Sequence, residues 1–448
     1  MSSAFFRIEE HAVDASHIRG FPRATSTTQD EVLKLAVKQY TPLNNPNPTS
    51  GDITIIAAHA NGFPKELYEP LWDELIQRGE KYGFKIRGIW IADVVNQGWS
   101  SVLNEDKLGD DRKPLLALRY SQQHANTFFP ASWLDHSRDL LHMVNVFRAQ
   151  IPRPIIGVGH SMGGCQLANL SLLHPRLFET LILIDPVIQP KMSITGNIGP
   201  AAASARRRER WPSRAEALKS FQKSKFYQAW DTRVLHRWVQ YGLRDVPTAV
   251  FPDAKAPEVT LTTTKHQEVM TFLRPNFPAQ PGDTEPSSAD FTTNNPKLNR
   301  RTHADLTPQA EPQAPFYRGE SAIVFNQLPA IRPSVFYIFG SESSLTNPAI
   351  IEEKVAMTGV GVGGSGGRAE GRVESVTVQD AGHLIPMEKV QESAEHIGTW
   401  VQKEMVRYRD WERKTEEEWG ARKGVERSVL SKRFVDEITA LMKKQSKL

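Results

Sequence analysis

The sequence Gly159-His160-Ser161-Met162-Gly163 is the part of this chain best suited to chemistry. It follows an apolar run at 154–158 and precedes an amphipathic stretch at 165–170, an order that predicts a strand, a tight turn and a helix. A serine on such a turn projects its hydroxyl away from the backbone, and the flanking glycines avoid collisions between strand and helix. The N–H groups at the start of the helix would face a developing negative charge. The pattern predicts that Ser161 is a nucleophile.

A serine hydroxyl is a weak nucleophile near neutral pH and needs a neighbouring base. Residues 372–378 alternate in polarity like a strand and lead into Gln379-Asp380-Ala381-Gly382-His383. In a strand–turn–helix serine site of this kind, the base comes late in the chain, after the serine and an acid. We therefore predict that His383 takes the proton from Ser161.

Two carboxyl groups compete for the role of the acid, which holds the imidazole in its tautomer and stabilises the imidazolium. Asp185 ends the apolar run 181–184, the predicted strand after the nucleophile helix. Glu342 follows the run 335–340, the next predicted core strand. We favour Asp185 and keep Glu342 as the alternative.

The glycine-rich stretch 361–366 matches the spacing of a dinucleotide fingerprint, but a helical pattern precedes it and a strand follows it. A true fingerprint needs the opposite order, so we predict a flexible loop and no nicotinamide or flavin cofactor. The sequence has no Cys-x-x-Cys and no His-Glu-x-x-His, so we expect no metal site.

The composition is that of a soluble globular protein, with 24% charged and 39% hydrophobic residues among 448. The net charge of +4 is too small to indicate a nucleic-acid partner. With Cys165 as the single cysteine, no intramolecular disulfide can form, which fits a reducing compartment. The sequence contains no secretory signal and no apolar stretch of transmembrane length.

Strand and helix patterns alternate at 51–190 and again at 331–405, which predicts an α/β fold with a mostly parallel sheet and helices on both faces. Residues 1–50 are interpreted as an N-terminal lead-in and linker. The alternation stops at 191–330, which predicts an inserted helical cap containing a mobile segment at 276–316. Aromatic residues at 211–243 could line an acyl pocket or simply pack the cap onto the core. Residues 406–448 are densely charged and predict a helical extension.

The sequence closes with Ser446-Lys447-Leu448, the tripeptide that import receptors read as a peroxisomal matrix address. We therefore expect the peroxisomal import receptor as a partner and the peroxisome matrix as the location.

Several segments together resemble a fungal branch of the α/β-hydrolases that includes peroxisomal lipases and esterases of toxin biosynthesis. The matching segments are 59–66, 159–164, 183–187, the predicted cap through 241–243, 359–367 and 382–388. The resemblance covers about residues 50 to 400. It implies the α/β-hydrolase fold and a Ser-His-acid hydrolase in which Ser161 and His383 carry the reaction.

The resemblance also suggests where an oxyanion would bind. Residues 61–64 are similar to the His-Gly-x-Pro turn of the family, so the N–H groups of Phe63 and Met162 would be the two donors. Asn61 replaces the usual histidine, and His59 is interpreted mainly as structural.

The resemblance bears on the acid as well. In such relatives the residue that matches Asp185 is typically acidic. Many members of the fold instead place the acid in a Gly-x-x-Asp pattern after the next strand. That pattern would put the acid at Ser343, one residue beyond Glu342.

These observations together predict an esterase or lipase that needs no cofactor and cleaves carboxylic esters, with lipid or acyl esters favoured. An acyl-CoA thioesterase is the first alternative, for which the arginines at 206–208 could contact the CoA phosphates. A hydrolase of toxin or secondary-metabolite biosynthesis is another. A binding scaffold with a hydrolase fold is a non-enzyme alternative, against which the intact Ser161 and His383 argue.

Overall fold

A computed structural model describes residues 2–22, 24–109, 132–192, 194–275, 316–422 and 424–445. The chain divides into two compact units, Met1–Gln402 and Lys403–Leu448. Apart from Phe316, the segment 276–316 lies outside the described residues, as does the tripeptide 446–448.

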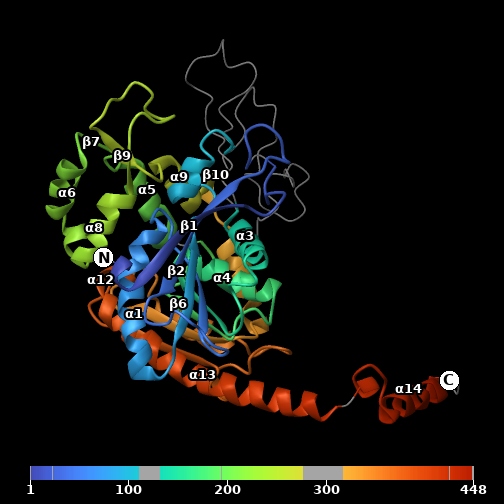
Figure 1. The fold of residues 1–448 in the computed structure, drawn as a ribbon. Coiled ribbons are helices and arrows are strands. Elements are labelled where there is room, and N and C mark those ends of the chain that lie inside the picture. The colour runs from blue at the N-terminus through green and yellow to red at the C-terminus, as the bar shows by residue number, and fades with distance from the viewer. Residues whose placement is uncertain are drawn as a thin grey trace, which may run out of the picture. The chain divides into compact units, whose positions relative to one another are not determined.

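The first unit is built around an eight-stranded sheet with the order β1-β2-β4-β3-β5-β6-β12-β13 (Figure 1). β2 is antiparallel to β1 and β4, and the remaining neighbours are parallel. The strands are β1 Phe6–Asp14, β2 Lys34–Pro42, β3 Ile53–Ala58, β4 Ile86–Ala92, β5 Ile155–His160, β6 Thr180–Ile184, β12 Ser334–Gly340 and β13 Val373–Val378. This is the mostly parallel sheet that the sequence predicted.

The sheet starts earlier in the chain than the sequence interpretation allowed. Residues 1–50 are not merely a lead-in, because they contain β1 and β2 at one edge of the sheet. β1 has few buried side chains, chiefly Phe6 and Val13, because an edge strand is covered on few sides. Such a polar strand gives only a weak pattern in the sequence.

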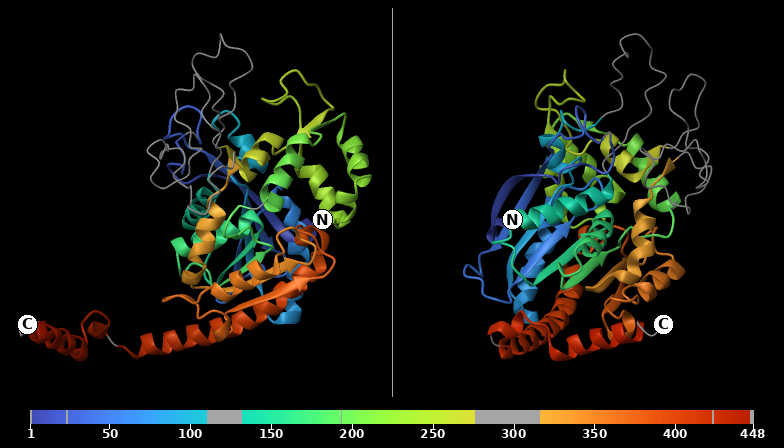
Figure 2. Two further views of the ribbon diagram at one scale, coloured as in Figure 1. Left: turned by 180° about the vertical axis from the view of Figure 1, so that it is seen from behind. Right: turned by 90° about the vertical axis from the view of Figure 1, so that its right-hand side faces the viewer.

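Helices cover both faces of the sheet (Figure 2). Along β12, Val335 and Tyr337 belong to a buried hydrophobic core that also contains side chains of α3 and α4. The ring of Phe336, between them, stacks on Trp400 of α13. Successive side chains of a strand point to opposite faces, so these helices lie on opposite sides. The helices of this layer arrangement are α1 Glu69–Tyr82, α2 Gly98–Leu103, α3 Trp133–Val146, α4 Met162–Leu173, α10 Glu320–Gln327, α11 Pro348–Met357, α12 Ile385–Glu388 and the first part of α13 Val390–Ala421.

A large insertion separates β6 from β12. It contains the helices α5 Gly199–Arg206, α6 Arg214–Gln222, α7 Lys225–Gln228, α8 Thr232–Tyr241 and α9 Lys265–Phe272. It also contains a small sheet of β7 Arg210–Trp211, β9 Val259–Leu261 and β8 Leu243–Asp245, and the pair β10 Arg274–Pro275 and β11 Phe316–Tyr317. The sequence interpretation anticipated short helices at 211–243 but not these strands, which are too short to give a periodic pattern. We call residues 191–317 the cap, because Val324 and Phe325 of the following helix α10 belong to the core against the sheet.

The second unit is helical in its described residues. It consists of the last part of α13 and of α14 Lys432–Gln445. Arg413 pairs with Glu417 one turn along α13, and Lys414 pairs with Asp410. Within the described ranges, no helix is both long and apolar enough to cross a membrane.

Candidate functional site

The candidate catalytic residues meet at the carboxyl ends of the parallel strands. We call this side of the sheet, which is distinct from its outer strands, the sheet edge. Ser161 follows β5, Asp185 follows β6, Ser343 lies just beyond β12, and His383 follows β13. The loop that begins at His59 follows β3. The carboxyl ends of neighbouring parallel strands share one edge, so residues far apart in the chain are brought together.

Ser161 has the strained backbone that the turn requires, with φ 58° and ψ −118°. The two glycines leave room for it. A Cβ at Gly163 would lie 2.2 Å from the carbonyl oxygen of Ala58, and one at Gly159 would lie 2.7 Å from the carbonyl oxygen of Gly163. Larger residues at these positions would force strand and helix apart.

Ser161, His383 and Asp185 form a continuous hydrogen-bonded chain. Ser161 Oγ lies 2.8 Å from His383 Nε2, and His383 Nδ1 lies 2.6 Å from Asp185 Oδ2. With the ring proton on Nδ1 facing the carboxylate, Nε2 accepts the hydrogen bond from the serine hydroxyl. Asp185 is buried, whereas the His383 side chain is 30% exposed. The arrangement suits proton transfer from the serine to the imidazole.

The structure distinguishes the two candidate acids. Glu342 is exposed, and its backbone N–H donates to the carbonyl of Ala381; Asp185 is the carboxylate at His383. Ser343, one residue later, points inward and donates its hydroxyl to Asp185 Oδ2 at 2.5 Å. The sequence interpretation noted Ser343 only as the place where an acid was missing. Its position was the signal, because the Gly-x-x-Asp pattern would place a carboxyl group there, and here the hydroxyl contacts the carboxylate that follows another strand.

A buried lysine lies close to this acid. Lys354 of α11 is 1% exposed, and its Nζ donates to the carbonyl of Pro186 at 3.4 Å. Burial lowers the pKa of Lys354 to about 8, although the nearby charge of Asp185 acts in the opposite direction. Sequence reasoning missed Lys354, because it is one polar residue on an otherwise ordinary helix.

A second chain of hydrogen bonds links three of the loops. The N–H of Ala60 donates to Tyr68 Oη at 2.8 Å, and the Tyr68 hydroxyl donates to His160 Nδ1 at 2.9 Å. His160 Nε2 in turn donates to the carbonyl oxygen of His383 at 2.9 Å. Burial lowers the pKa of His160 to about 3, so the ring is neutral and can play both roles. Sequence reasoning did not find this connection.

The two expected oxyanion donors both border the same cavity as Ser161. Met162 is the first residue of α4, where backbone N–H groups are not used within the helix. The N–H of Phe63 donates to the carbonyl of Ala60 at 3.3 Å. His59 is buried: its Nδ1 donates to the carbonyl of Ala60 at 2.8 Å and its Nε2 accepts from the N–H of Val94 at 3.0 Å. His59 therefore has a structural role.

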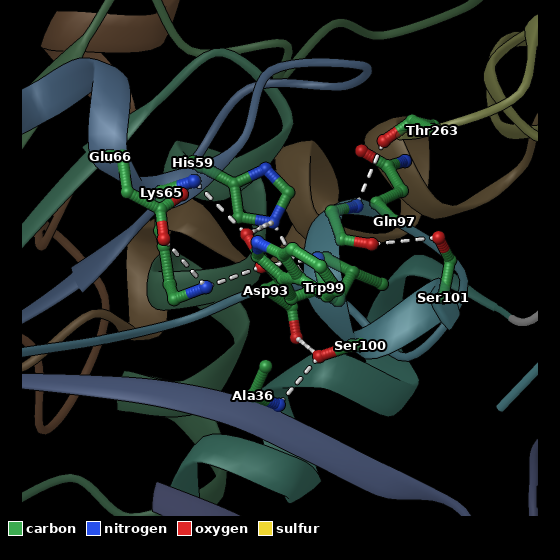
Figure 3. A network of polar contacts seen from close by, with 12 residues as sticks. Ala36, His59, Lys65, Glu66, Asp93, Gln97, Trp99, Ser100, Ser101 and Thr263 are labelled. Atoms are coloured by element: carbon green, nitrogen blue, oxygen red, sulfur yellow. Dashed lines mark hydrogen bonds and ion pairs between the residues drawn. The ribbon is translucent and has the colours of Figure 1, made fainter. Parts of the chain in front are cut away.

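Buried polar contacts hold the loop after β3 in place (Figure 3). The ammonium group of Lys65 donates to Asp93 Oδ2 at 2.6 Å, and its backbone N–H donates to Oδ1 at 3.0 Å. The side chain of Gln97 accepts from the N–H of Gly62 at 2.8 Å and donates to Asn61 Oδ1 at 2.7 Å. Asn61 thus positions the loop, although it replaces the family's usual histidine.

A cavity of about 470 Å³ lies over Ser161 and His383. Its wall is largely apolar and includes Phe226, Phe272 and Leu345. The aromatic residues of the cap fall into two groups. Phe226 and Tyr227 line the cavity, whereas Trp230 and Trp238 are buried, with ring centroids 6.2 Å apart.

Two features of the described residues bear on cofactor and metal binding. In the described part of the chain, no group of three or more His, Cys, Asp or Glu side chains could hold a metal ion. The glycine-rich stretch 361–366 lies between helix α11 and strand β13 and bonds to the backbone of Pro329. This order is the reverse of a dinucleotide-binding turn.

Comparison with known proteins places these features in a family. The model of the alpha/beta hydrolase family matches residues 55–395. The chain belongs to the α/β-hydrolase family. It is therefore a hydrolase, and the fold expected from the sequence is confirmed.

Fungal relatives extend along nearly the whole chain. The protein named "Type I acyl-CoA thioesterase mpaH" of Penicillium roqueforti is 42% identical over 97% of this chain and 95% of its own length. Its namesake in Penicillium brevicompactum is 40% identical over 93% and 92%. The solved structure of the Saccharomyces cerevisiae peroxisomal α/β-hydrolase Lpx1 covers 99% of this chain and 97% of its own, with a TM-score of 0.62 and 15% identity, which shows a shared fold. The resemblance to fungal α/β-hydrolases is confirmed.

Proposed function

We propose that this protein is a serine hydrolase that releases acyl groups from esters through Ser161, His383 and Asp185. The observation that carries the proposal is the continuous hydrogen-bonded chain from Ser161 to Asp185 at the floor of the cavity. A nucleophile, a base and an orienting acid within hydrogen-bond distance are the parts that acyl transfer to a serine requires.

In the first half of the reaction, Ser161 Oγ attacks the acyl carbonyl carbon while His383 Nε2 takes its proton. Asp185 stabilises the resulting imidazolium, and Ser343 holds the carboxylate in place. The N–H groups of Met162 and Phe63 would bind the oxyanion. Phe63 would exchange its long hydrogen bond to a backbone carbonyl for a shorter bond to the oxyanion.

In the second half, the imidazolium of His383 gives its proton to the leaving alcohol or thiol, and the acyl-enzyme remains on Ser161. Water then attacks the acyl carbon, with His383 as the base, and the carboxylic acid leaves. A thiol is the easier leaving group, because its pKa of about 8.5 lies far below that of an alcohol.

The substrate class we propose first is an acyl-CoA thioester. The sequence alone favoured lipid esters, but relatives at 42% and 40% identity that match nearly the whole chain are named acyl-CoA thioesterases. Carboxylic esters, including those of lipids, remain the second candidate, since the same residues would cleave them.

The test of the nucleophile is labelling of the purified protein with a fluorophosphonate. Wild type should be labelled, Ser161→Ala should not, and Ser171→Ala on the same helix should be labelled like wild type. Labelling that persists in Ser161→Ala would contradict the assignment. A folded wild type that is not labelled would favour the binding scaffold.

The test of the substrate class compares octanoyl-CoA with p-nitrophenyl octanoate. Ser161→Ala and His383→Ala should each lower turnover of both substrates by roughly 10⁴-fold or more. A kcat/KM for octanoyl-CoA well above that for the ester would support the thioesterase. The reverse ratio would restore lipid and other esters as the leading class.

Peroxisomal import through Ser446-Lys447-Leu448 also stays a prediction. A fluorescent protein fused to the N-terminus of the chain should accumulate in peroxisomes, and deletion of 446–448 should leave it in the cytosol. Identical distributions of the two fusions would contradict the predicted address.

A further inference from the structure

One side of the cavity carries polar side chains that the proposed reaction does not use. Ser204 lies on α5, Arg207 directly follows α5, Tyr227 lies on α7 and Glu268 lies on α9. All four line the cavity that contains Ser161. We call them the cap polar cluster. They come from three helices of the cap, so no segment of the sequence shows them together.

The cluster is centred on the carboxylate of Glu268. Ser204 Oγ donates to Glu268 Oε1 at 2.7 Å, and Arg207 Nη1 donates to Glu268 Oε2 at 2.8 Å. The side chains of Arg207 and Glu268 are 22% and 10% exposed. The guanidinium group also lies over the ring of Trp238, with Cζ 5.5 Å from the ring centroid. Arg207 and Glu268 therefore form a half-buried pair with no net charge.

Arg207 retains capacity to donate hydrogen bonds. A guanidinium group has five N–H donors, and only Nη1 contacts Glu268. Among the described residues, the other guanidinium nitrogens have no hydrogen-bond acceptor. Tyr227 adds another hydroxyl donor nearby, and burial raises its pKa, so the hydroxyl stays protonated.

The cluster lies beside the place where the carbonyl would react. A Cβ at Gly62 would lie 2.8 Å from Glu268 Cδ, so this side chain packs directly against the loop that carries Phe63. Asn61 of the same loop donates to the backbone carbonyl of Glu268 at 3.0 Å. Because Ser161 and the cluster line one cavity, the cluster is within the space open to an acyl group held at Ser161.

A plain hydrocarbon chain fits such a wall badly. It would displace water from the free N–H groups of Arg207 and offer them no acceptor, which is unfavourable in a cavity with apolar walls. An oxygen atom on the chain would replace the lost water. Because the charge of Arg207 is already balanced by Glu268, a neutral oxygen fits better than a second anion.

We propose that the cap polar cluster is a subsite for a neutral oxygen-bearing substituent, such as a ketone, hydroxyl or phenol, on the acyl group of the substrate. This inference rests on the proposed acyl hydrolase function. It narrows the substrate from acyl esters in general to oxygenated acyl groups, with Arg207 as the main donor.

The experiment compares p-nitrophenyl octanoate with its 5-oxo and 7-oxo analogues. For each protein, the readout is kcat/KM for each oxo ester divided by kcat/KM for the plain ester. Wild type should prefer at least one oxo ester by about tenfold. Arg207→Met should lose this preference, and Arg207→Lys should keep part of it. Arg206→Met is the matched control, because Arg206 is the exposed neighbour outside the cavity, and it should behave like wild type.

Arg207→Met leaves the Glu268 carboxylate without its cation and could misfold for that reason, so a second variant is needed. The double variant Arg207→Met/Glu268→Gln removes both charges, and it should also lose the oxo preference. Wild type without preference for either oxo ester would overturn the proposal. The proposal would also be overturned if the double variant still preferred an oxo ester. A cooperative unfolding transition would show that this variant is folded.

A third substrate pair separates the acyl group from the CoA phosphates. Octanoyl-CoA and octanoyl-pantetheine share the acyl chain, and the second lacks the 3′-phospho-ADP part of CoA, which carries all of its phosphates. The readout is kcat/KM for octanoyl-CoA divided by kcat/KM for octanoyl-pantetheine. If Arg207→Met changes this ratio but leaves the preference for oxo esters unchanged, Arg207 binds a phosphate and the subsite proposal is wrong. Failure of the proposed function is a different result, because no ester would then be cleaved and no serine labelled.

Discussion

The edge of the sheet and the cap contribute to this site in different ways. At the sheet edge, backbone pairing places the reacting residues: His160 pairs with Ile184, so Ser161 and Asp185 follow neighbouring strands at the same level. In the cap, side chains of separate helices meet through packing, as Arg207 of the α5 end and Glu268 of α9 do.

The sheet edge and the cap are therefore expected to control different properties of the protein. The sheet edge contains a buried hydrogen-bonded framework whose members have few alternative positions. The cap presents side chains to the cavity that range from buried Glu268 to exposed Phe226. We therefore expect substitutions at the sheet edge to change turnover and stability, and substitutions in the cap to change the preferred acyl group.

Among the variants that test this comparison, the largest effect should come from Asp185, the proposed acid. Asp185→Asn should lower kcat by about 10³-fold to 10⁴-fold, because the amide would favour the wrong tautomer of His383. Glu342→Gln should leave kcat within about twofold, because this side chain is exposed and does not contact His383. Steady-state kinetics with p-nitrophenyl octanoate measures both, and equal losses would show that Asp185 has no special role.

The second effect concerns stability at the sheet edge. Lys65→Met should lower the free energy of unfolding by about 3–5 kcal/mol, because the buried carboxylate of Asp93 would lose its ammonium partner, whereas Glu66 would keep its pair with Lys38. Lys225→Met on α7 of the cap is the control; this residue is exposed, and its variant should unfold like wild type. Urea unfolding measures the difference. Indistinguishable midpoints would mean that the buried ion pairs do not anchor the loop.

The third effect is a pH dependence from His136 of α3, a fully buried residue. Neither ring nitrogen has a partner among the described residues, and burial lowers the pKa of His136 to about 3. The unfolded chain binds this proton near pH 6.5, so the stability contribution is complete above pH 6.5 and falls as the pH drops towards 3. From pH 7 to pH 5, wild type should lose about 2 kcal/mol more than His136→Leu.

Urea unfolding of both proteins at the two pH values checks this. The other buried histidines, such as His160, are present in both proteins, so their contributions cancel in the comparison. Parallel pH profiles for wild type and His136→Leu would show that His136 does not lose its proton on folding.

The smallest effect should come from the apolar wall of the cap. Phe226 is 53% exposed and lines the cavity, so Phe226→Ala should lower kcat/KM for octanoyl substrates about fivefold and shift the chain-length optimum. Val250→Ala, in the cap but away from this cavity, should leave the optimum unchanged. A series of p-nitrophenyl esters from acetate to dodecanoate measures it. An unchanged optimum in Phe226→Ala would place the acyl chain elsewhere.

The sequence by itself determined the features that depend on local order. A serine between two glycines, after an apolar run and before a helix, specifies a strained turn, because backbone sterics permit few other residues there. The alternating runs specify a parallel sheet, and His383 after the last strand follows from the same topology. These features can be predicted from the order of residues that are close together in the sequence.

The tertiary structure decided what depends on side chains meeting across strands and helices. Asp185 and Glu342 both follow core strands, but only the carboxylate of Asp185 points at His383, and the hydroxyl of Ser343 contacts the same carboxylate. The cap polar cluster joins Arg207 to Glu268 across 61 residues. Such pairs arise from packing between elements, and the spacing of residues within a single element carries no information about them.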